Sequence, residues 1–241
     1  DEFPIQPKKH SLEFLRENAH LRMRTNTFSS VFRVRHALTF AIHKYFNDRG
    51  FFNIHTPILT GTDGEGAGEM FRVTMLDPKN PPLTEEGKVD YSVDFFGKVT
   101  NLCVTGQLEA ELAAMALSKV YTFGPTFRAE NSNTSRHLAE FWMIEPEVAF
   151  CDIHGNMDLA EDFLKEVIKD VVETCPDDLQ FLSDRITQEE KGLPQDQRQP
   201  MELLEKLKFV SDNDFARITY TEAFDILRNS KPNKKKKFKY P

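Results

Sequence analysis

Two arginines, Arg128 and Arg136, stand in and beside what otherwise reads as an apolar strand hairpin. A guanidinium group makes bidentate contacts to phosphate or carboxylate oxygens, so arginines in this setting predict a bound anion. The turn-forming residues 131–135 lie between them, and a loop of this kind places its two flanking strands side by side. On the second strand, Phe141 offers a flat ring on which a purine can stack. The pattern favours a nucleotide site on an antiparallel sheet.

The residues around this loop predict two strands, a buried one at 120–123 and an alternating one at 141–150. We expect one face of the second strand to pack and the other to present chemistry. The packing face comprises Trp142, Ile144, Val148 and Phe150, and the other face comprises Phe141, Met143, Glu145 and Glu147. The spacing by itself also fits structural ion pairs of Arg128 with Glu130 or Glu145, and this alternative stays open.

The hairpin resembles the second signature motif of class II aminoacyl-tRNA synthetases, in the form used by the aspartyl, asparaginyl and lysyl subgroup. The resemblance rests on Phe-Arg-x-Glu at 127–130 and Arg-His-x-x-Glu-Phe at 136–141. Residues 50–59 are similar to the first motif of the class, and residues 105–111 resemble the segment that binds the amino acid. Within the subgroup the asparaginyl branch matches best, chiefly through residues 136–147.

This resemblance implies the class II synthetase catalytic fold, an α+β fold with an antiparallel sheet flanked by helices. No segment matches the third motif, a glycine-rich strand followed by a helix with another ATP-binding arginine, so we expect the fold to be incomplete on its C-terminal side. We interpret residues 1–28 as a linker from a missing anticodon-binding domain. Residues 29–175 would form the catalytic core, and 176–241 a helical insertion with a truncated continuation. Such a fragment is expected to have little activity alone.

The activity that the resemblance implies is asparagine–tRNA ligation, in which ATP converts asparagine to asparaginyl-adenylate before transfer to the 3′ end of tRNA(Asn). Arg128 would bridge the asparagine carboxylate and the α-phosphate. Glu130 would accept a hydrogen bond from the adenine amino group, and Phe141 would stack on the adenine ring. Arg136 and His137 would hold the outer phosphates. Mg²⁺ normally accompanies the nucleotide, but its carboxylate ligands are expected outside this chain, so no metal ligand is assigned.

The amino-acid pocket is expected beside the glycine-rich segment 61–68. The resemblance implies that this loop closes over the amino acid with Glu65 facing its ammonium group, whereas the plain alternative is a flexible connection. Gln107 would add an amide oxygen to the same ammonium. Aspartyl enzymes carry a lysine where this chain has Ala110, so the positive charge that aspartate requires is absent. Glu145 would accept a hydrogen bond from the side-chain amide of asparagine.

Two other functions remain in view. An ammonia-dependent asparagine-forming ligase has the same architecture but uses aspartate and no tRNA. A non-catalytic synthetase paralogue is expected to have lost some of the four residues Gln107, Arg128, Glu130 and Phe141, all of which are present. The resemblance also implies a homodimer formed through the helix and strand at 30–59.

Composition fits a water-exposed enzyme piece. The chain has 241 residues, of which 39% are hydrophobic, and no apolar run approaches the ~20 residues that span a bilayer. No segment reads as a signal peptide, and three widely spaced cysteines suggest a reducing cytoplasm. A net charge of −7 means that any RNA contact must be local. The candidate patch comprises Lys8, Lys9, His10, Arg16, His20, Arg22 and Arg24; a solvated helix face is the alternative reading.

Hydrophobic periodicity predicts the remaining elements. One helix should start at a Ser29 or Ser30 cap and end at Gly50. A second should follow Gly106, with Leu108, Leu112, Met115 and Ala116 facing inward. Further helices are expected at 157–173, 201–209 and 221–228, and further strands at 51–59, 70–76, 91–95 and 99–104, the last two joined by a turn at Gly97-Lys98.

Overall fold

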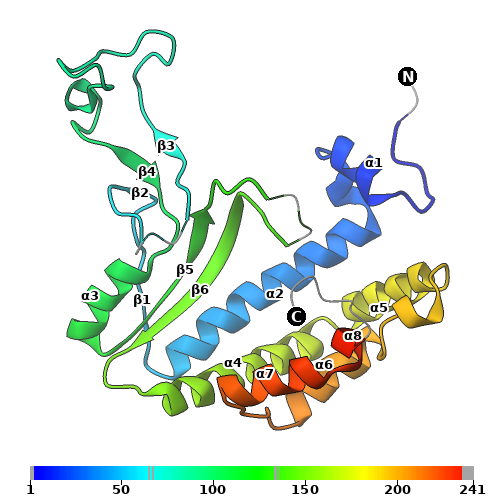
Figure 1. Ribbon diagram of the computed structural model, residues 1–241. Coiled ribbons are helices and arrows are strands. Elements are labelled where there is room, and N and C mark those ends of the chain that lie inside the picture. The colour runs from blue at the N-terminus through cyan, green and yellow to red at the C-terminus, as the bar shows by residue number, and fades with distance from the viewer. Residues whose placement is uncertain (1–2, 65, 67, 133, 135, 235–241) are drawn as a thin grey trace. The chain divides into compact units, whose positions relative to one another are not determined.

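The computed structural model describes residues 3–64, 66, 68–132, 134 and 136–234 of the chain (Figure 1). The chain divides into two compact units. One is Arg35–Met157, and the other combines Asp1–Val34 with Asp158–Pro241. The division into linker, core and insertion that we expected from the sequence concerns functional domains and stays a prediction.

The main sheet of the Arg35–Met157 unit has the strand order β1-β5-β6, with β1 at Phe52–Asn53, β5 at Lys119–Phe127 and β6 at Glu140–Val148. Strands β5 and β6 form a long antiparallel hairpin in which Lys119 lies opposite Val148 and Phe127 opposite Glu140 (Figure 1). Strand β1 pairs with β5 in parallel, which the long connection between them permits. The sheet is thus antiparallel, as predicted, in its central hairpin but mixed at β1.

A second, smaller sheet is antiparallel throughout and has the order β2-β4-β3, formed by Leu59–Thr60, Thr100–Leu102 and Arg72–Val73. The strands predicted at 70–76 and 99–104 are shorter than expected, and the single strand predicted at 51–59 is instead two short strands, β1 and β2, in different sheets. The strand and hairpin predicted at 91–95 and 97–98 are wrong. Tyr91–Val93 (η2) is instead a turn of 3₁₀-helix whose cap, Asp90, accepts a hydrogen bond from the Ser92 N–H at 2.9 Å. A local carboxylate acceptor of this kind competes with strand pairing for the backbone donors.

Helix α2 (Asn26–Asp48) begins earlier than the predicted serine caps. The Thr25 hydroxyl accepts a hydrogen bond from the Phe28 N–H at 3.3 Å, so the helix is capped there. Its end before Gly50, which has φ +77°, agrees with the prediction. In the Arg35–Met157 unit, Phe46 of α2 stacks on Tyr121 of β5 with ring centroids 4.4 Å apart, and the His43 ring forms a 2.7 Å hydrogen bond with the Tyr121 hydroxyl. These contacts hold α2 against the sheet.

Helix α3 (Gln107–Leu117) presents a different face to the core from the one predicted. Leu112 and Met115, which we expected to face inward, are 75% and 80% exposed, whereas Ala110 and Ala114 pack on Val120 of β5. The helix is joined to β5 through Ser118 alone, which adopts φ 69°. A helix held this close to a strand accommodates only small side chains at the contact.

The other unit is helical. Its elements are α1 (Leu12–Glu17), η1 (Arg22–Arg24), the start of α2, most of α4 (Ile153–Thr174), α5 (Pro176–Glu190), η3 (Gln195–Gln197), α6 (Leu203–Asp212), α7 (Tyr220–Asn229) and α8 (Lys231–Lys234). The three helices predicted near 157–173, 201–209 and 221–228 are confirmed. Helix α5 was not predicted from its proline-bearing sequence; Pro176 occupies the first turn, where proline favours a helix. Arg33 of α2 pairs with Asp178 of α5 at 2.5 Å.

Candidate active site

Arg128 lies one residue beyond the end of β5, and its backbone N–H continues the hairpin by donating to the Ala139 carbonyl at 3.0 Å. Its guanidinium carbon lies 5.5 Å from the centroid of the Phe141 ring, and Nη2 donates to the Val104 carbonyl at 3.5 Å. The Nε atom is buried and has no hydrogen-bond partner among the described residues. A buried donor without an acceptor is costly, so this Nε calls for an acceptor that the described residues do not supply.

The described structure does not contain the alternative ion pair of Arg128 with Glu130 or Glu145. Within the described part of the chain, Arg128 makes no salt bridge with Glu130 or Glu145. Glu130 is exposed beside the glycine-rich loop, and the carboxylate of Glu145 is bound elsewhere.

The strand register brings residues of both strands to one face. Thr126 lies directly opposite Phe141, and Thr122 lies directly opposite Glu145. Because side chains alternate along a strand, the even-numbered residues of β5 share a face with the odd-numbered residues of β6. That face therefore carries Thr122, Thr126, Phe141 and Glu145, and Arg128 continues it.

The opposite face of β6 is less buried than predicted. Trp142 is 48% exposed, although its ring packs edge-on against Phe123 at a centroid distance of 5.1 Å. Phe150 is fully exposed and adopts φ 60° just past the end of the strand. β6 is an edge strand of its three-stranded sheet, and Phe150 lies beyond the last residue of that strand.

Glu145 is the most heavily bonded side chain of this face. Its Oε2 atom accepts hydrogen bonds from the Thr122 hydroxyl at 2.9 Å and from the Gly106 N–H at 3.1 Å, and its Oε1 atom accepts one from the Thr105 hydroxyl. Glycine fits closely at position 106, because a Cβ atom there would lie 2.6 Å from Thr56 Oγ1, which would have to shift. These bonds attach the start of α3 to the middle of the β5–β6 hairpin.

Gln107, the first residue of α3, lies next to this cluster. Its backbone N–H donates to Thr105 Oγ1 at 3.0 Å, and its side-chain Nε2 donates to Glu111 at 3.1 Å. With the NH₂ group occupied by Glu111, the amide oxygen is the free end of the side chain; it accepts no hydrogen bond from any residue that the structure describes. Ala110 is fully buried and adds no charge to this side of the site.

The electrostatic field divides the site into a negative and a positive side. Burial raises the pKa of the Glu147 carboxyl above its ordinary value, and the nearby carboxylates of Glu111 and Glu145 raise it further. Arg128 supplies the positive charge. A zwitterion fits such a site with its ammonium group toward the carboxylates and its own carboxylate toward the arginine.

The glycine-rich segment ends against the arginine strand. A Cβ atom on Gly68 would lie 2.5 Å from Glu130 Oε1 and 3.7 Å from Arg128 Cδ, and the Glu69 carbonyl accepts a 2.7 Å hydrogen bond from the Ala129 N–H. The structure therefore brings the end of this segment to Arg128. Glu65 itself lies outside the described residues.

Arg136 and His137 are exposed in the loop between β5 and β6. The His137 ring is hydrogen-bonded to the Thr134 hydroxyl, which also accepts from the Arg136 N–H at 3.3 Å. The structure thus places these two residues in the connecting loop and assembles Gln107, Arg128, Phe141 and Glu145 on and beside the hairpin. Sequence reasoning missed Thr105 and Thr122. The only local signal for Thr122 is its even-numbered spacing from Arg128, which places both residues on the same face of the strand.

Residues 11–240 match the model of the family described as tRNA synthetases class II (D, K and N). The chain belongs to this class II synthetase family. It is 60% identical over 238 residues to the asparagine–tRNA ligase of Cytophaga hutchinsonii, covering 99% of this chain and 48% of that protein. It is 54% identical over 240 residues to the asparagine–tRNA ligase of Alkaliphilus oremlandii, covering 100% and 48%. The chain therefore spans about half the length of the curated relatives it matches.

Solved class II synthetases share the fold. The asparaginyl-tRNA synthetase from Pyrococcus horikoshii, complexed with asparaginyl-adenylate, superimposes with a TM-score of 0.72 at 28% identity, covering 94% of this chain and 44% of that one. The predicted fold class and family of this synthetase chain are both confirmed.

Among the described residues, no group of three or more His, Cys, Asp or Glu side chains is arranged to hold a metal ion. Cys103, Cys151 and Cys175 are free thiols. None of the described helices is long and apolar enough to cross a membrane.

Proposed function

We propose that the full-length protein is an asparagine–tRNA ligase. The observation that carries the proposal is the buried Nε of Arg128, which has no partner among the described residues and lies on the same face as Glu145 and Phe141. The Arg128 guanidinium also contacts the carbonyl of Val104, three residues before Gln107. This combination suits a carboxylate and a phosphate that must be held together. The identity of 60% to an asparagine–tRNA ligase over nearly the whole chain supports the choice of asparagine.

In the first step, an oxygen of the asparagine carboxylate attacks the α-phosphorus of ATP in line, and the bond to pyrophosphate breaks. Because both reactants are anions, the main contribution of the protein is to hold them in position and to neutralise charge. Arg128 would contact the carboxylate and the α-phosphate together. Phe141 would stack on adenine, and Glu130 would accept from its amino group. No protein nucleophile takes part.

The outer phosphates would be held by Arg136 and His137, both exposed in the hairpin loop. Mg²⁺, when bound, would neutralise further phosphate charge; its ligands are not assigned to any residue of this chain. In the second step, the 3′-terminal ribose hydroxyl of tRNA attacks the adenylate carbonyl carbon and AMP leaves. The low activity expected of the 241-residue chain alone stays a prediction.

For the amino acid, we propose that Gln107 accepts a hydrogen bond from the ammonium group and that Glu145 accepts one from the side-chain amide. Glu65 would be a second partner of the ammonium, and the approach of Gly68 to Arg128 supports a place for this loop at the site. The side-chain carboxylate of aspartate would be repelled by the negative Glu145 carboxylate. Residue 110 is alanine, so no lysine is present there to offset this repulsion.

Amino-acid-dependent exchange of pyrophosphate into ATP tests this function in the full-length protein. We expect exchange with asparagine and little with aspartate. Aspartate-dependent exchange coupled to ammonia incorporation would instead identify the asparagine-forming ligase. Absence of exchange with either amino acid, with tRNA bound normally, would identify a non-catalytic paralogue.

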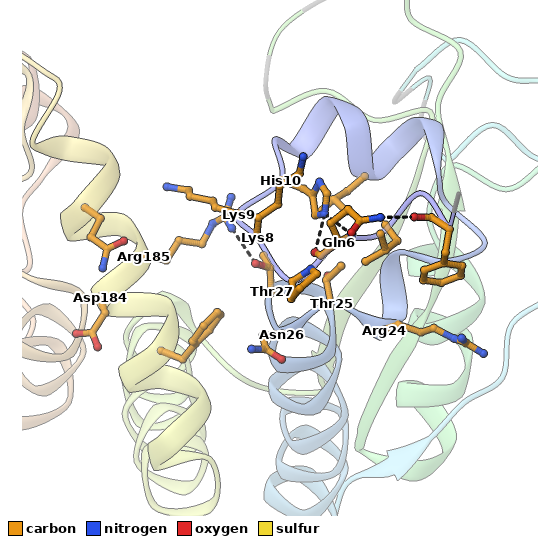
Figure 2. Close-up of a pocket in the computed structure, with 16 residues that line it drawn as sticks. Gln6, Lys8, Lys9, His10, Arg24, Thr25, Asn26, Thr27, Asp184 and Arg185 are labelled. Atoms are coloured by element: carbon orange, nitrogen blue, oxygen red, sulfur yellow. Dashed lines mark hydrogen bonds between the residues drawn. The ribbon is translucent and has the colours of Figure 1, made fainter. Parts of the chain in front are cut away.

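We further propose that tRNA contacts a basic cavity of the helical unit. The cavity has a volume of about 860 Å³, and Figure 2 shows Lys8, Lys9 and His10 before α1, Arg24 before α2 and Arg185 on α5 around it. Neither Lys8 nor Arg24 forms a salt bridge with a described residue, whereas Lys9 and Arg185 pair with Glu189 at 3.4 Å and 3.0 Å. Unpaired cations in a chain of net charge −7 suit the phosphates of an RNA.

A homodimer is also proposed. Phe40 of α2 and Phe52 of β1 are 63% and 54% exposed, and Leu59 of β2 is exposed in the same predicted region. Apolar side chains of this size on the segment expected to dimerise support a contact with a second copy. Sedimentation of the full-length protein tests it.

A further inference from the structure

We propose that Thr122 and Thr105 set the choice between asparagine and aspartate by holding the Glu145 carboxylate in one orientation. Both are positioning residues, since they act through Glu145 and not on the substrate. The proposal rests on the proposed function and names the source of its amino-acid specificity.

The hydrogen bonds to Glu145 leave one acceptor position open. A carboxylate offers about four lone-pair positions, two on each oxygen. Thr122 and the Gly106 N–H occupy both positions on Oε2, and the Thr105 hydroxyl occupies one on Oε1. The remaining position lies on Oε1. A side-chain amide has an N–H to donate there, whereas a second carboxylate has only negative charge to offer.

Without these donors the carboxylate would not stay in place. The terminal torsion of a glutamate is broad, so its orientation depends on the groups that bind it. Thr122 is only 3% exposed and lines a small cavity of about 100 Å³ together with Gly106 and Glu145. Its hydroxyl is directed at Glu145, to which it donates, so its role in the proposal is to fix that carboxylate.

Thr105 has a second partner. While its hydroxyl donates to Glu145, its oxygen accepts the Gln107 N–H at 3.0 Å. One hydroxyl thus links the residue proposed to read the side chain with the residue proposed to meet the ammonium group. Loss of the Thr105 hydroxyl should disturb both recognition steps, and loss of the Thr122 hydroxyl should disturb mainly the discrimination against aspartate.

The experiment compares kcat/KM for pyrophosphate exchange with asparagine and with aspartate in the full-length protein. Thr122→Val keeps the shape and removes the hydroxyl, and we expect the asparagine-to-aspartate ratio to fall by about 10- to 100-fold, the range for one hydrogen bond to a charged group. Thr122→Ser, which keeps the hydroxyl, should restore most of the ratio. The matched control is Thr126→Val, which removes a buried hydroxyl of the same strand that donates to the Phe141 carbonyl at 3.2 Å. The control should leave the ratio unchanged.

Thr105→Val provides a second test at a less buried position, in case the Thr122 variant does not fold. It should raise KM for asparagine and also lower the ratio. If wild type activates asparagine and folded Thr122→Val or Thr105→Val keeps the wild-type ratio, the inference is wrong and the proposed function stands. If wild type exchanges no pyrophosphate with asparagine, the proposed function fails and takes this inference with it.

Discussion

Thr122 on β5 lies directly opposite Glu145 on β6, and its hydroxyl donates a 2.9 Å hydrogen bond to the Glu145 carboxylate. The pair connects the register of the hairpin to the chemistry of the site. A slip of one residue would turn every β6 side chain to the other face and remove Glu145 and Phe141 from the side of Arg128. The bond that we propose to serve recognition therefore also stabilises the correct register.

Arg128→Lys should severely impair the full-length enzyme although it keeps the charge. Lysine is a point donor and cannot contact a carboxylate and a phosphate in the fixed geometry of a guanidinium group. Loss of one such preorganised contact costs about 10² to 10³ in rate, which pyrophosphate exchange will measure. The control is Arg228→Lys on the exposed face of α7, which should be nearly silent. Equal and small losses in both variants would assign Arg128 a structural role.

Glu145→Gln should lose activity with asparagine and selectivity against aspartate together. Three donors, the Thr105 and Thr122 hydroxyls and the Gly106 N–H, now point at the two carboxylate oxygens of Glu145. Glutamine has only one acceptor oxygen, so at least one of these donors would meet its NH₂ group, which is itself a donor. Exchange assays with both amino acids measure the two effects. Normal activation of asparagine with continued rejection of aspartate would show that Glu145 is not the discriminating group.

Gly106→Ala should lower stability by about 1–3 kcal/mol, because the new methyl group overpacks the site beside Thr56. Gly124→Ala on β5 is the matched control, since a Cβ atom there would meet nothing within 4 Å. Denaturant unfolding of the two variants measures the difference. Similar stability of both would mean that Thr56 moves aside without cost.

Acid should weaken the hydrogen bonds that Glu161 of α4 accepts from Lys165, Phe215 and Arg217. Hydrogen bonds, first from Lys165 and then from the Phe215 N–H and Arg217, lower the pKa of Glu161 to about 2 from an ordinary 4.5. A depressed pKa stabilises the fold at pH values above the unfolded-state pKa, so this contribution is complete above about pH 4.5 and is lost as the pH falls toward 2. Glu161→Gln should flatten the dependence of stability on pH in this window, as followed by circular dichroism. Glu205→Gln, at an exposed position of α6, should not.

The basic cavity makes a prediction about salt. The double variant Lys8→Ala with Arg24→Ala should bind tRNA more weakly and reduce the slope of log affinity against log salt by about 1 to 2, because each phosphate contact contributes nearly one released counterion. The double variant Lys88→Ala with Lys98→Ala, which removes two exposed cations elsewhere in the chain, controls for overall charge. An unchanged slope would show that these residues contact solvent and not tRNA.

The sequence by itself determined most of the helices and indicated the residues that we propose to carry the chemistry. Two arginines beside an apolar hairpin, the glycine before Gln107 and the alternation along 141–147 are local patterns, and the family match confirms the class they indicated. Helices α2, α4, α6 and α7 follow from a period of 3.6 residues, which needs no knowledge of the partner. Proline in the first turn hid α5, since residue preferences there resemble those of a loop.

Only the tertiary structure decided what each surface contacts. The apolar stripe of α3 predicted the wrong face. The helix packs closely on Val120, so the small side chains of Ala110 and Ala114 occupy the contact and Leu112 is exposed. The donors that converge on Glu145 come from residues 23 to 40 positions away, so no local pattern reveals them. Hydrogen bonding depends on distances of a few tenths of an ångström between such segments, and these are defined only when the sheet and helix have packed.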